Sequence, residues 1–318
     1  MPEHGVTHEA DGAPAERFDV VVIGAGVGGL AAGARLAHCG RRVLVLDRDD
    51  WIGGRAGTIE HEGFLLPQGG IALELGGPME RLFHEVGARY DVRAPRRGVV
   101  VRLGRRTIDT TNPIARLLVD GVGRRLGRRA MRRWVRPDGA DGTLAELVRR
   151  TRAGGAVQRL ARSIAAGAFG VNADEVSAHA VLTYVTEKGA FRRYGYGPRG
   201  TGSVLEELGR VIERHGGEVR LGVEAERILV RDGRAHAVAV RPAEGGPTLQ
   251  VACDAVVSNA GPAATVTLVG EEHLTAAYLD TVRAGDVPTP MIVVDVASEH
   301  PLLEEAGIVF FGTTERVS

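Results

Sequence analysis

Residues 18–29, FDVVVIGAGVGG, contain the pattern in this chain that is most specific for one type of fold. The first half of this stretch, 18–23, is rich in β-branched residues, a pattern typical of a parallel strand buried on both faces. Gly24, Gly26 and Gly29 then follow the GxGxxG spacing. The first of these glycines permits a tight turn, the second lets the backbone approach a pyrophosphate, and the third lets a helix pack closely on the sheet. The stretch therefore predicts the start of a dinucleotide-binding βαβ unit.

The residues downstream complete this unit. An alanine-rich stretch, 30–38, predicts a helix whose amino-terminal N–H groups attract phosphate, and Gly40 ends it. A second buried strand over 42–47 finishes on Asp47, a carboxylate that can accept from ribose hydroxyls. The alternative is a strand-to-helix turn without a ligand, but here all the parts of the motif occur in order. The expected cofactor-binding residues of this unit are Gly24, Ala25, Gly26, Gly28, Gly29 and Asp47.

A second glycine-rich segment, 48–58, begins directly after Asp47. Arg48 opens it, and Gly53 and Gly54 permit a backbone turn against a diphosphate that Arg55 can neutralise. The alternative is a solvated loop with a surface arginine, which is less plausible directly after a dinucleotide fingerprint.

Together these motifs resemble the flavin amine oxidase and phytoene desaturase superfamily, and above all the phytoene desaturase-like carotenoid and retinoid oxidoreductases. The resemblance is specific over 18–75 and 196–262. It implies FAD, with Arg48, Gly53, Gly54 and Arg55 beside the diphosphate. It also implies that the backbone of Ala225 contacts the adenine and that the strand ending at Asn259 returns under the cofactor.

The resemblance further implies hydride transfer from a substrate C–H bond to flavin N5, with the protein binding and orienting the reactants. The expected reaction is desaturation of an apolar, isoprenoid or carotenoid-like small molecule. Two alternatives stay open: an amine oxidase or protoporphyrinogen oxidase-like flavoenzyme, and a non-catalytic FAD-binding fragment. Candidate polar groups are Tyr184, Glu187, Lys188, Tyr194 and Tyr196, but a surface helix end and loop explain them better. No catalytic residue is therefore assigned.

The chain departs from the family pattern in two places. Residues 67–70, Pro-Gln-Gly-Gly, stand where the family often has Asp-x-Gly-Pro. Nothing after Met291 resembles the Gly-Asp segment with which the family closes over the flavin. We therefore expect a fragment or a truncated reading frame.

The motifs and the resemblance imply an α/β fold, a Rossmann-like FAD-binding domain interleaved with an α+β substrate domain, and a length of 318 residues is consistent with about two domains. Ser203 and Glu206 predict a capping box at a helix start, and Asp232-Gly233 predicts a hairpin turn. The expected FAD-binding segments are 16–75 and 196–262, and the expected substrate segments are 76–195 and 263–318, the last one incomplete.

The cysteine content and the charge distribution bear on two other kinds of site, a metal site and an anion-binding surface. The net charge is zero, and neither Cys39 nor Cys253 belongs to a cluster with metal-ligand spacing, so no metal site is expected. The only acidic residues within 93–136 are Asp109 and Asp120. That segment carries arginine pairs in helical spacing, which can bind an anionic membrane surface or form a solvated face. The paired residues are Arg124, Arg125, Arg128, Arg129, Arg132 and Arg133.

The remaining expectations concern partners and location. Nucleic acid is not expected, because Trp134 is the only aromatic side chain among these arginine pairs. The first fifteen residues lack an apolar core, and no later run of about 18 apolar residues offers a membrane span. We expect a cytoplasmic protein, and the arginine pairs leave two alternatives open, peripheral contact with a membrane or a solvated helical face.

Overall fold

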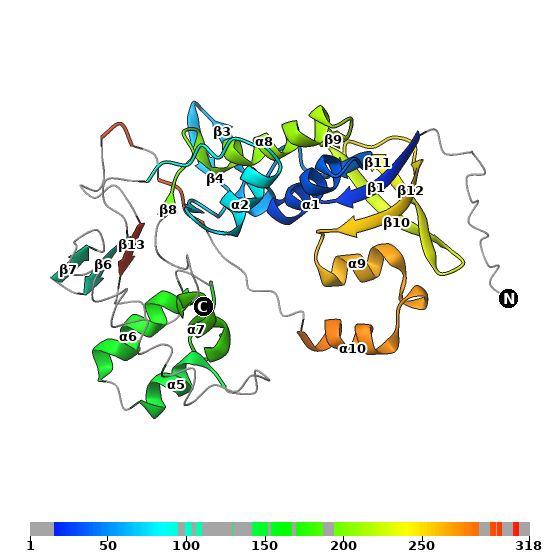
Figure 1. Cartoon of the computed structure of the whole chain (residues 1–318). Coiled ribbons are helices and arrows are strands. Elements are labelled where there is room, and N and C mark those ends of the chain that lie inside the picture. Colours follow the sequence, from blue (N-terminus) through cyan, green and yellow to red (C-terminus); the bar gives the residue numbers. More distant parts are fainter. Residues whose placement is uncertain are drawn as a thin grey trace. The chain divides into compact units, whose positions relative to one another are not determined.

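The computed structural model consists of two compact units, each built from segments that are separated in the sequence (Figure 1). The first unit comprises 1–70, 82–90 and 199–287, and the second comprises 71–81, 91–198 and 288–318. The structure describes residues 16–94, 99–103, 106–109, 129, 142–151, 154–166, 170–186, 194–285, 293–296, 298–300 and 308–311.

The first unit is organised around a six-stranded mixed sheet with strand order β10-β11-β12-β1-β2-β9. The strand β1 pairs in parallel with both β12 and β2, and β2 pairs in parallel with β9, whereas β10, β11 and β12 are antiparallel to one another. The bounds are β1 Glu16–Ile23, β2 Val43–Leu46, β9 Glu218–Arg220, β10 Val223–Arg231, β11 Arg234–Pro242 and β12 Leu249–Ser258. The predicted α/β class is confirmed.

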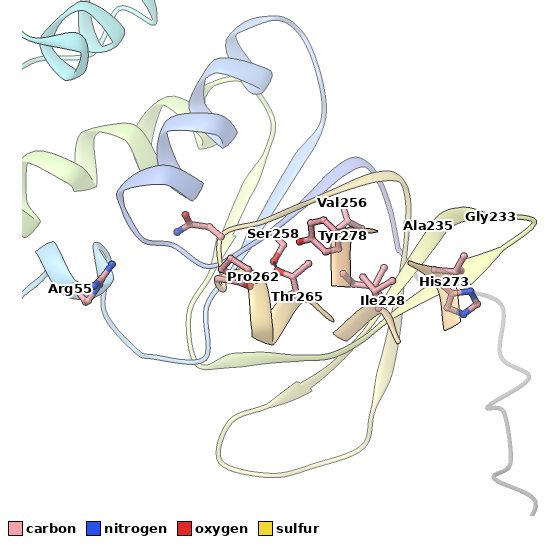
Figure 2. Close-up of a pocket in the computed structure, with 14 residues that line it drawn as sticks. Arg55, Ile228, Gly233, Ala235, Val256, Ser258, Pro262, Thr265, His273 and Tyr278 are labelled. Carbon is pink, nitrogen blue, oxygen red and sulfur yellow. Dashed lines mark hydrogen bonds between the residues drawn. The ribbon is translucent and has the colours of Figure 1, made fainter. Parts of the chain in front are cut away.

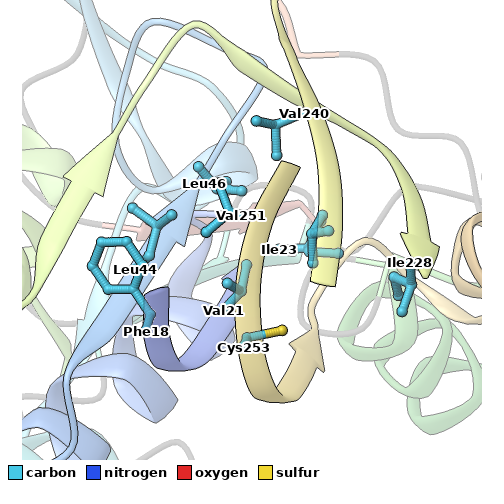
Figure 3. Close-up of a cluster of buried hydrophobic side chains, with 10 residues drawn as sticks. Phe18, Val21, Ile23, Leu44, Leu46, Ile228, Val240, Val251 and Cys253 are labelled. Atoms are coloured by element: carbon cyan, nitrogen blue, oxygen red, sulfur yellow. The ribbon is translucent and has the colours of Figure 1, made fainter. Parts of the chain in front are cut away.

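Both faces of the parallel strands are buried, which explains their continuous apolar sequence. On one face Val21, Ile23 and Leu44 join a core cluster with Ile228 and Val251 (Figure 3). The opposite face lies under α1 (Val27–His38) and α8 (Gly200–Arg214). There, a Cβ atom on Gly33 of α1 would meet Val45 of the sheet at 3.0 Å and Ile212 of α8 at 3.1 Å. These helices therefore pack close to the sheet and to each other.

The β10–β11 hairpin turns at Asp232 and Gly233, as the sequence predicts. Both residues have positive φ angles, 50° and 72°, which is the requirement of a type I′ turn. This local sequence therefore fixes the register of the two strands.

Two features of the first unit differ from the sequence predictions. The prediction of a capping box at Ser203 is wrong, because α8 already begins at Gly200 and the Ser203 hydroxyl donates to the Gly200 carbonyl at 2.8 Å. Residues 263–285, expected in the substrate domain, lie in the first unit as α9 (Pro262–Val269), a short 3-10 turn (Glu271–His273) and α10 (Ala276–Gly285). The helix α9 packs on β10, with Leu268 and Val269 against the core cluster.

The other elements are short. The hairpin of β3 (Thr58–His61) and β4 (Phe64–Pro67) belongs to the first unit. The second unit contains β5 (Leu73–Glu74) paired with β8 (Tyr194–Gly195), and a sheet of β13 (Ile308–Phe311), β6 (Val99–Leu103) and β7 (Arg106–Asp109). Its helices are α5 (Leu144–Arg150), α6 (Gly155–Ile164) and α7 (Ala178–Thr186), while α2 (Pro78–Glu85) contains residues of both units.

Several predictions fall on residues outside the described ranges, among them Glu187, Lys188 and all the paired arginines except Arg129. Arg129 itself is exposed. In the part of the chain that the structure describes, no helix is long and apolar enough to cross a membrane.

Candidate functional site

The GxGxxG turn connects the end of β1 to the start of α1. Gly24 has a φ of +101°, which only glycine adopts without strain, and its N–H donates to the Leu46 carbonyl at 2.7 Å. A Cβ atom on Gly29 would overlap the Gly24 carbonyl oxygen. Both glycines are therefore required by the turn itself, whether or not a ligand is bound.

No side chain of the described residues caps the amino-terminus of α1. Gly26, the N-cap residue, supplies no side-chain cap, and the first intrahelical bond runs from the Leu30 N–H to the Gly26 carbonyl at 2.9 Å. The atoms nearest to a Cβ on Gly26 or Gly28 belong to the Asn259 carboxamide, at 2.9 Å and 2.6 Å. Uncapped N–H groups at a helix start attract anions, so this glycine surface fits a phosphate group.

The Asp47 side chain stabilises the same turn through hydrogen bonds to backbone N–H groups. Its carboxylate accepts the Ala25 N–H at 2.6 Å and the Asp49 N–H at 3.0 Å. Each carboxylate oxygen has a further lone pair, so Asp47 can still accept from a sugar hydroxyl. The Ala25 N–H, by contrast, is occupied by this bond and Ala25 is fully buried.

The Gly53-Gly54-Arg55 segment lies directly against the glycine turn. The Gly53 N–H donates to the Ala25 carbonyl at 2.9 Å, and Gly53 forms a bridge with Gly26. Gly53 and Gly54 both have positive φ angles, 104° and 53°. These angles turn the chain so that Arg55 is exposed, and none of the described carboxylates forms an ion pair with it. An anion is the natural partner for this guanidinium.

The structure also positions Ala225, Arg48 and Asn259. Ala225 lies at a β-bulge of β10, and the same strand begins where the Val223 N–H donates to the Asp47 carbonyl at 2.8 Å. Asn259 directly follows β12, and its N–H donates to the Ile23 carbonyl at 2.7 Å. Arg48 is exposed and lies 3.9 Å from Asp49. All these positions belong to the first unit, and their contact with a cofactor stays a prediction.

A pocket of about 680 Å³ extends from Arg55 to His273 (Figure 2), and Asn259 is among the residues that line it. Its apolar wall comes from β10 and β12 and includes Ile228 and Val256. Its polar side includes the hydroxyls of Ser258 and Thr265, which lie 2.6 Å apart. The pocket therefore has an arginine at one end and a lining that mixes polar and apolar groups.

The described candidates for catalysis belong to the second unit. Tyr194 pairs with Glu74 in the β5–β8 ladder, and Tyr196 exchanges two backbone hydrogen bonds of 3.0 Å with Arg93. Burial raises the pKa of Tyr196, and burial also raises the pKa of Glu74 against an opposing effect of Arg81. Neither group is shown to act on a substrate, so no catalytic residue is assigned.

The two cysteines differ in environment. Cys253 is buried in the core cluster, and desolvation raises the pKa of its thiol to about 11, whereas Cys39 is exposed. Within the described residues, no group of three or more His, Cys, Asp or Glu side chains is arranged to hold a metal ion.

Sequence reasoning missed one group of residues that supports this site. Thr201 of α8 donates its hydroxyl to the Gly70 carbonyl, and the Thr58 hydroxyl accepts the Gly202 N–H. These bonds join segments more than 130 residues apart. The run of small residues at 200–203 was the only signal in the sequence.

Comparisons with known proteins agree with this geometry. The chain is 44% identical over 76 residues to a phytoene desaturase of Cercospora nicotianae and 47% identical over 70 residues to a phytoene dehydrogenase of Streptomyces griseus. The two matched segments cover 24% and 22% of this chain, but only 12% and 14% of those proteins. The local resemblance to phytoene desaturases is confirmed.

Solved structures show the same fold over most of the chain. An oxidoreductase from Methanosarcina mazei matches with a TM-score of 0.67 and 26% identity over 83% of this chain and 65% of its own. Wild-type putrescine oxidase matches with a TM-score of 0.59 and 18% identity over 84% of this chain and 63% of its own, a likeness of fold.

The sequence profile of the family described as flavin containing amine oxidoreductase matches residues 27–284. This range begins at Val27, the first residue of α1, and includes most of the first unit. The chain therefore belongs to the flavin-containing amine oxidoreductase family.

Proposed function

We propose that this chain binds FAD across the carboxyl ends of β1, β2 and β12 and serves an oxidoreductase reaction. One observation carries the proposal: the uncapped start of α1, the Gly53–Arg55 turn and Asn259 lie together in one unit. In open α/β sheets, ligands bind outside the carboxyl ends of the parallel strands. Family membership supports a flavin.

The described residues have distinct tasks in this proposal. The N–H groups at the start of α1 and the Arg55 guanidinium would neutralise the diphosphate. Asp47 would accept from the adenosine ribose, and the backbone of β10 near Ala225 would contact the adenine. The bound flavin would supply the hydride-accepting chemistry, while the protein binds, orients and excludes water.

For the substrate, we propose an apolar, isoprenoid-like hydrocarbon from which a hydride is removed. Two observations support this class. The relatives with local identities above 40% include phytoene desaturases and a phytoene dehydrogenase. The pocket beside Arg55 includes apolar side chains of β10 and β12, Ile228 and Val256 among them, which a hydrocarbon can contact.

Titration of the purified chain with FAD tests the cofactor assignment. We expect Arg55→Ala to weaken FAD by about 1.5–3 kcal/mol, the scale of a hydrogen bond to a charged group. Arg231→Ala is the matched control, because Arg231 is an exposed arginine of the same unit at the far end of β10. Equal dissociation constants for both variants and the parent chain would show that Arg55 is only a surface residue.

Anaerobic mixing of the FAD-loaded chain with a polyene hydrocarbon and with a diamine tests the reaction. Bleaching of the flavin absorbance by the hydrocarbon alone supports the proposal. Bleaching by the diamine would favour an amine oxidase instead. Stoichiometric FAD without reduction by either compound, but with reduction by dithionite, would favour a binding role without catalysis.

A further inference from the structure

Thr201 occupies an unusual position for a polar side chain. It is the second residue of α8, and only 2% of its surface is exposed. Its hydroxyl donates to the Gly70 carbonyl at 2.8 Å. A valine would fill nearly the same volume without a polar atom, so space filling alone does not require threonine here.

The partner of Thr201 leads directly to Arg55. The Gly70 N–H donates to the Arg55 carbonyl at 2.8 Å. The preceding residue, Gly69, has a φ of +156°, and a Cβ atom there would lie 2.7 Å from the same Arg55 carbonyl oxygen. Residues 69 and 70 therefore lie tightly against the backbone of Arg55.

A second contact of α8 is made at Thr58, three residues after Arg55. The Gly202 N–H donates to the Thr58 hydroxyl at 3.1 Å, and a Cβ atom on Gly202 would lie 2.9 Å from the Thr58 backbone nitrogen. The first turn of α8 thus contacts the chain at two points that follow the Gly53–Arg55 turn, Thr58 and Gly70. Since α8 also packs on α1 and β9, it links this turn to the rigid sheet.

We propose that Thr201 is a positioning residue: through Gly70 it fixes the backbone of Arg55 and so holds the guanidinium at the cofactor diphosphate. The inference rests on the proposed FAD binding. Thr201 itself does not touch the cofactor in this scheme. Its hydroxyl limits how far the Arg55 segment can move away from the glycine turn.

Removal of the hydroxyl tests this role. Thr201→Val leaves the Gly70 carbonyl without its donor, and we expect FAD affinity to fall about three- to tenfold, the scale of one hydrogen bond. Thr201→Ser keeps the donor and should restore the parent affinity. Ser203→Ala is the matched control, because it removes a hydroxyl-to-carbonyl bond of 2.8 Å from the same helical turn without a link to Arg55.

A double-mutant cycle separates positioning from general stability. In the Arg55→Ala background, Thr201→Val should cause no further loss of FAD affinity, because the guanidinium that Thr201 positions is already absent. An equal loss in both backgrounds would overturn the inference in favour of a merely structural role.

Trypsin cleavage after Arg55 gives a second readout that needs no flavin. Arg55 is exposed, so we expect Thr201→Val to speed cleavage at this bond and Ser203→Ala to leave it unchanged. Faster cleavage of Thr201→Val than of the parent chain, together with no FAD binding by the parent chain, would support the backbone link and refute the proposed function. Unchanged cleavage and unchanged FAD affinity in Thr201→Val would refute the inference alone.

Discussion

Replacement of Gly53 by alanine measures how much the Gly53–Arg55 turn depends on its backbone shape. Gly53 has a φ of +104°, and a Cβ atom there would lie 2.9 Å from both N and Cα of Gly57 and 3.1 Å from Leu205. The left-handed backbone costs an alanine about 1–2 kcal/mol. The close approach adds about 1–3 kcal/mol, because Gly57 is backbone and cannot rotate away. We expect Gly53→Ala to destabilise the first unit by about 2–5 kcal/mol.

Gly40→Ala is the matched control. Gly40 also has a positive φ, +83°, but a Cβ atom there meets nothing within 4 Å. Gly40→Ala should lower the free energy of unfolding only by the cost of the left-handed backbone, about 1–2 kcal/mol. Urea unfolding followed by circular dichroism gives both values, and FAD titration should show weakened binding for Gly53→Ala alone. Equal stabilities and equal FAD affinities in the two variants would refute the reasoning that close packing at Gly53 shapes the site.

Two further predictions concern other regions of the chain. The raised pKa of Cys253, about 11 against a usual 9.0, means that the unfolded thiol ionises first. The contribution of Cys253 to the free energy of unfolding should therefore be constant below pH 9 and should fall by roughly 2–3 kcal/mol between pH 9 and 11. The parent chain should lose that much more stability over this range than Cys253→Ala, and equal losses in the two would contradict the prediction. For the arginine pairs, we expect co-sedimentation with anionic vesicles that fades with salt, since each arginine contributes about 1 kcal/mol; no binding at low salt would end the membrane hypothesis.

Much of the first unit follows from short-range sequence signals. The glycine turn and the Asp232-Gly233 hairpin require positive φ angles that few residues other than glycine adopt readily, so both are visible in the sequence. By contrast, the sequence indicates only where the strand before Asn259 ends, and it does not indicate that β12 begins as early as Leu249. Its first four residues pair with β11, and that pairing depends on tertiary contacts rather than on local pattern.

The contacts that hold the candidate site in place are harder to predict from the sequence, because they too are tertiary contacts. Thr201 and Gly70 are separated by 131 positions, and neither residue belongs to a motif. The expected cap at Ser203 failed because glycine at 200 allows the helix to start one turn earlier, with a φ of +80°. Likewise, α9 joins the first unit because Leu268 and Val269 find an apolar surface on the sheet, which local sequence does not reveal.

The double pairing of β12 suggests where the chain can be engineered. Residues 249–252 of this strand are in register with β11, Val240 opposite Leu249, and residues 251–258 are in register with β1, Ile23 opposite Ser258. An inserted residue within 253–258 would shift Asn259 away from the glycine turn, because a one-residue slip reverses every side chain. Residues 244–247, in contrast, form an exposed connection whose length does not set this register. A tag, a reporter domain or new chain termini introduced there should leave the glycine turn intact.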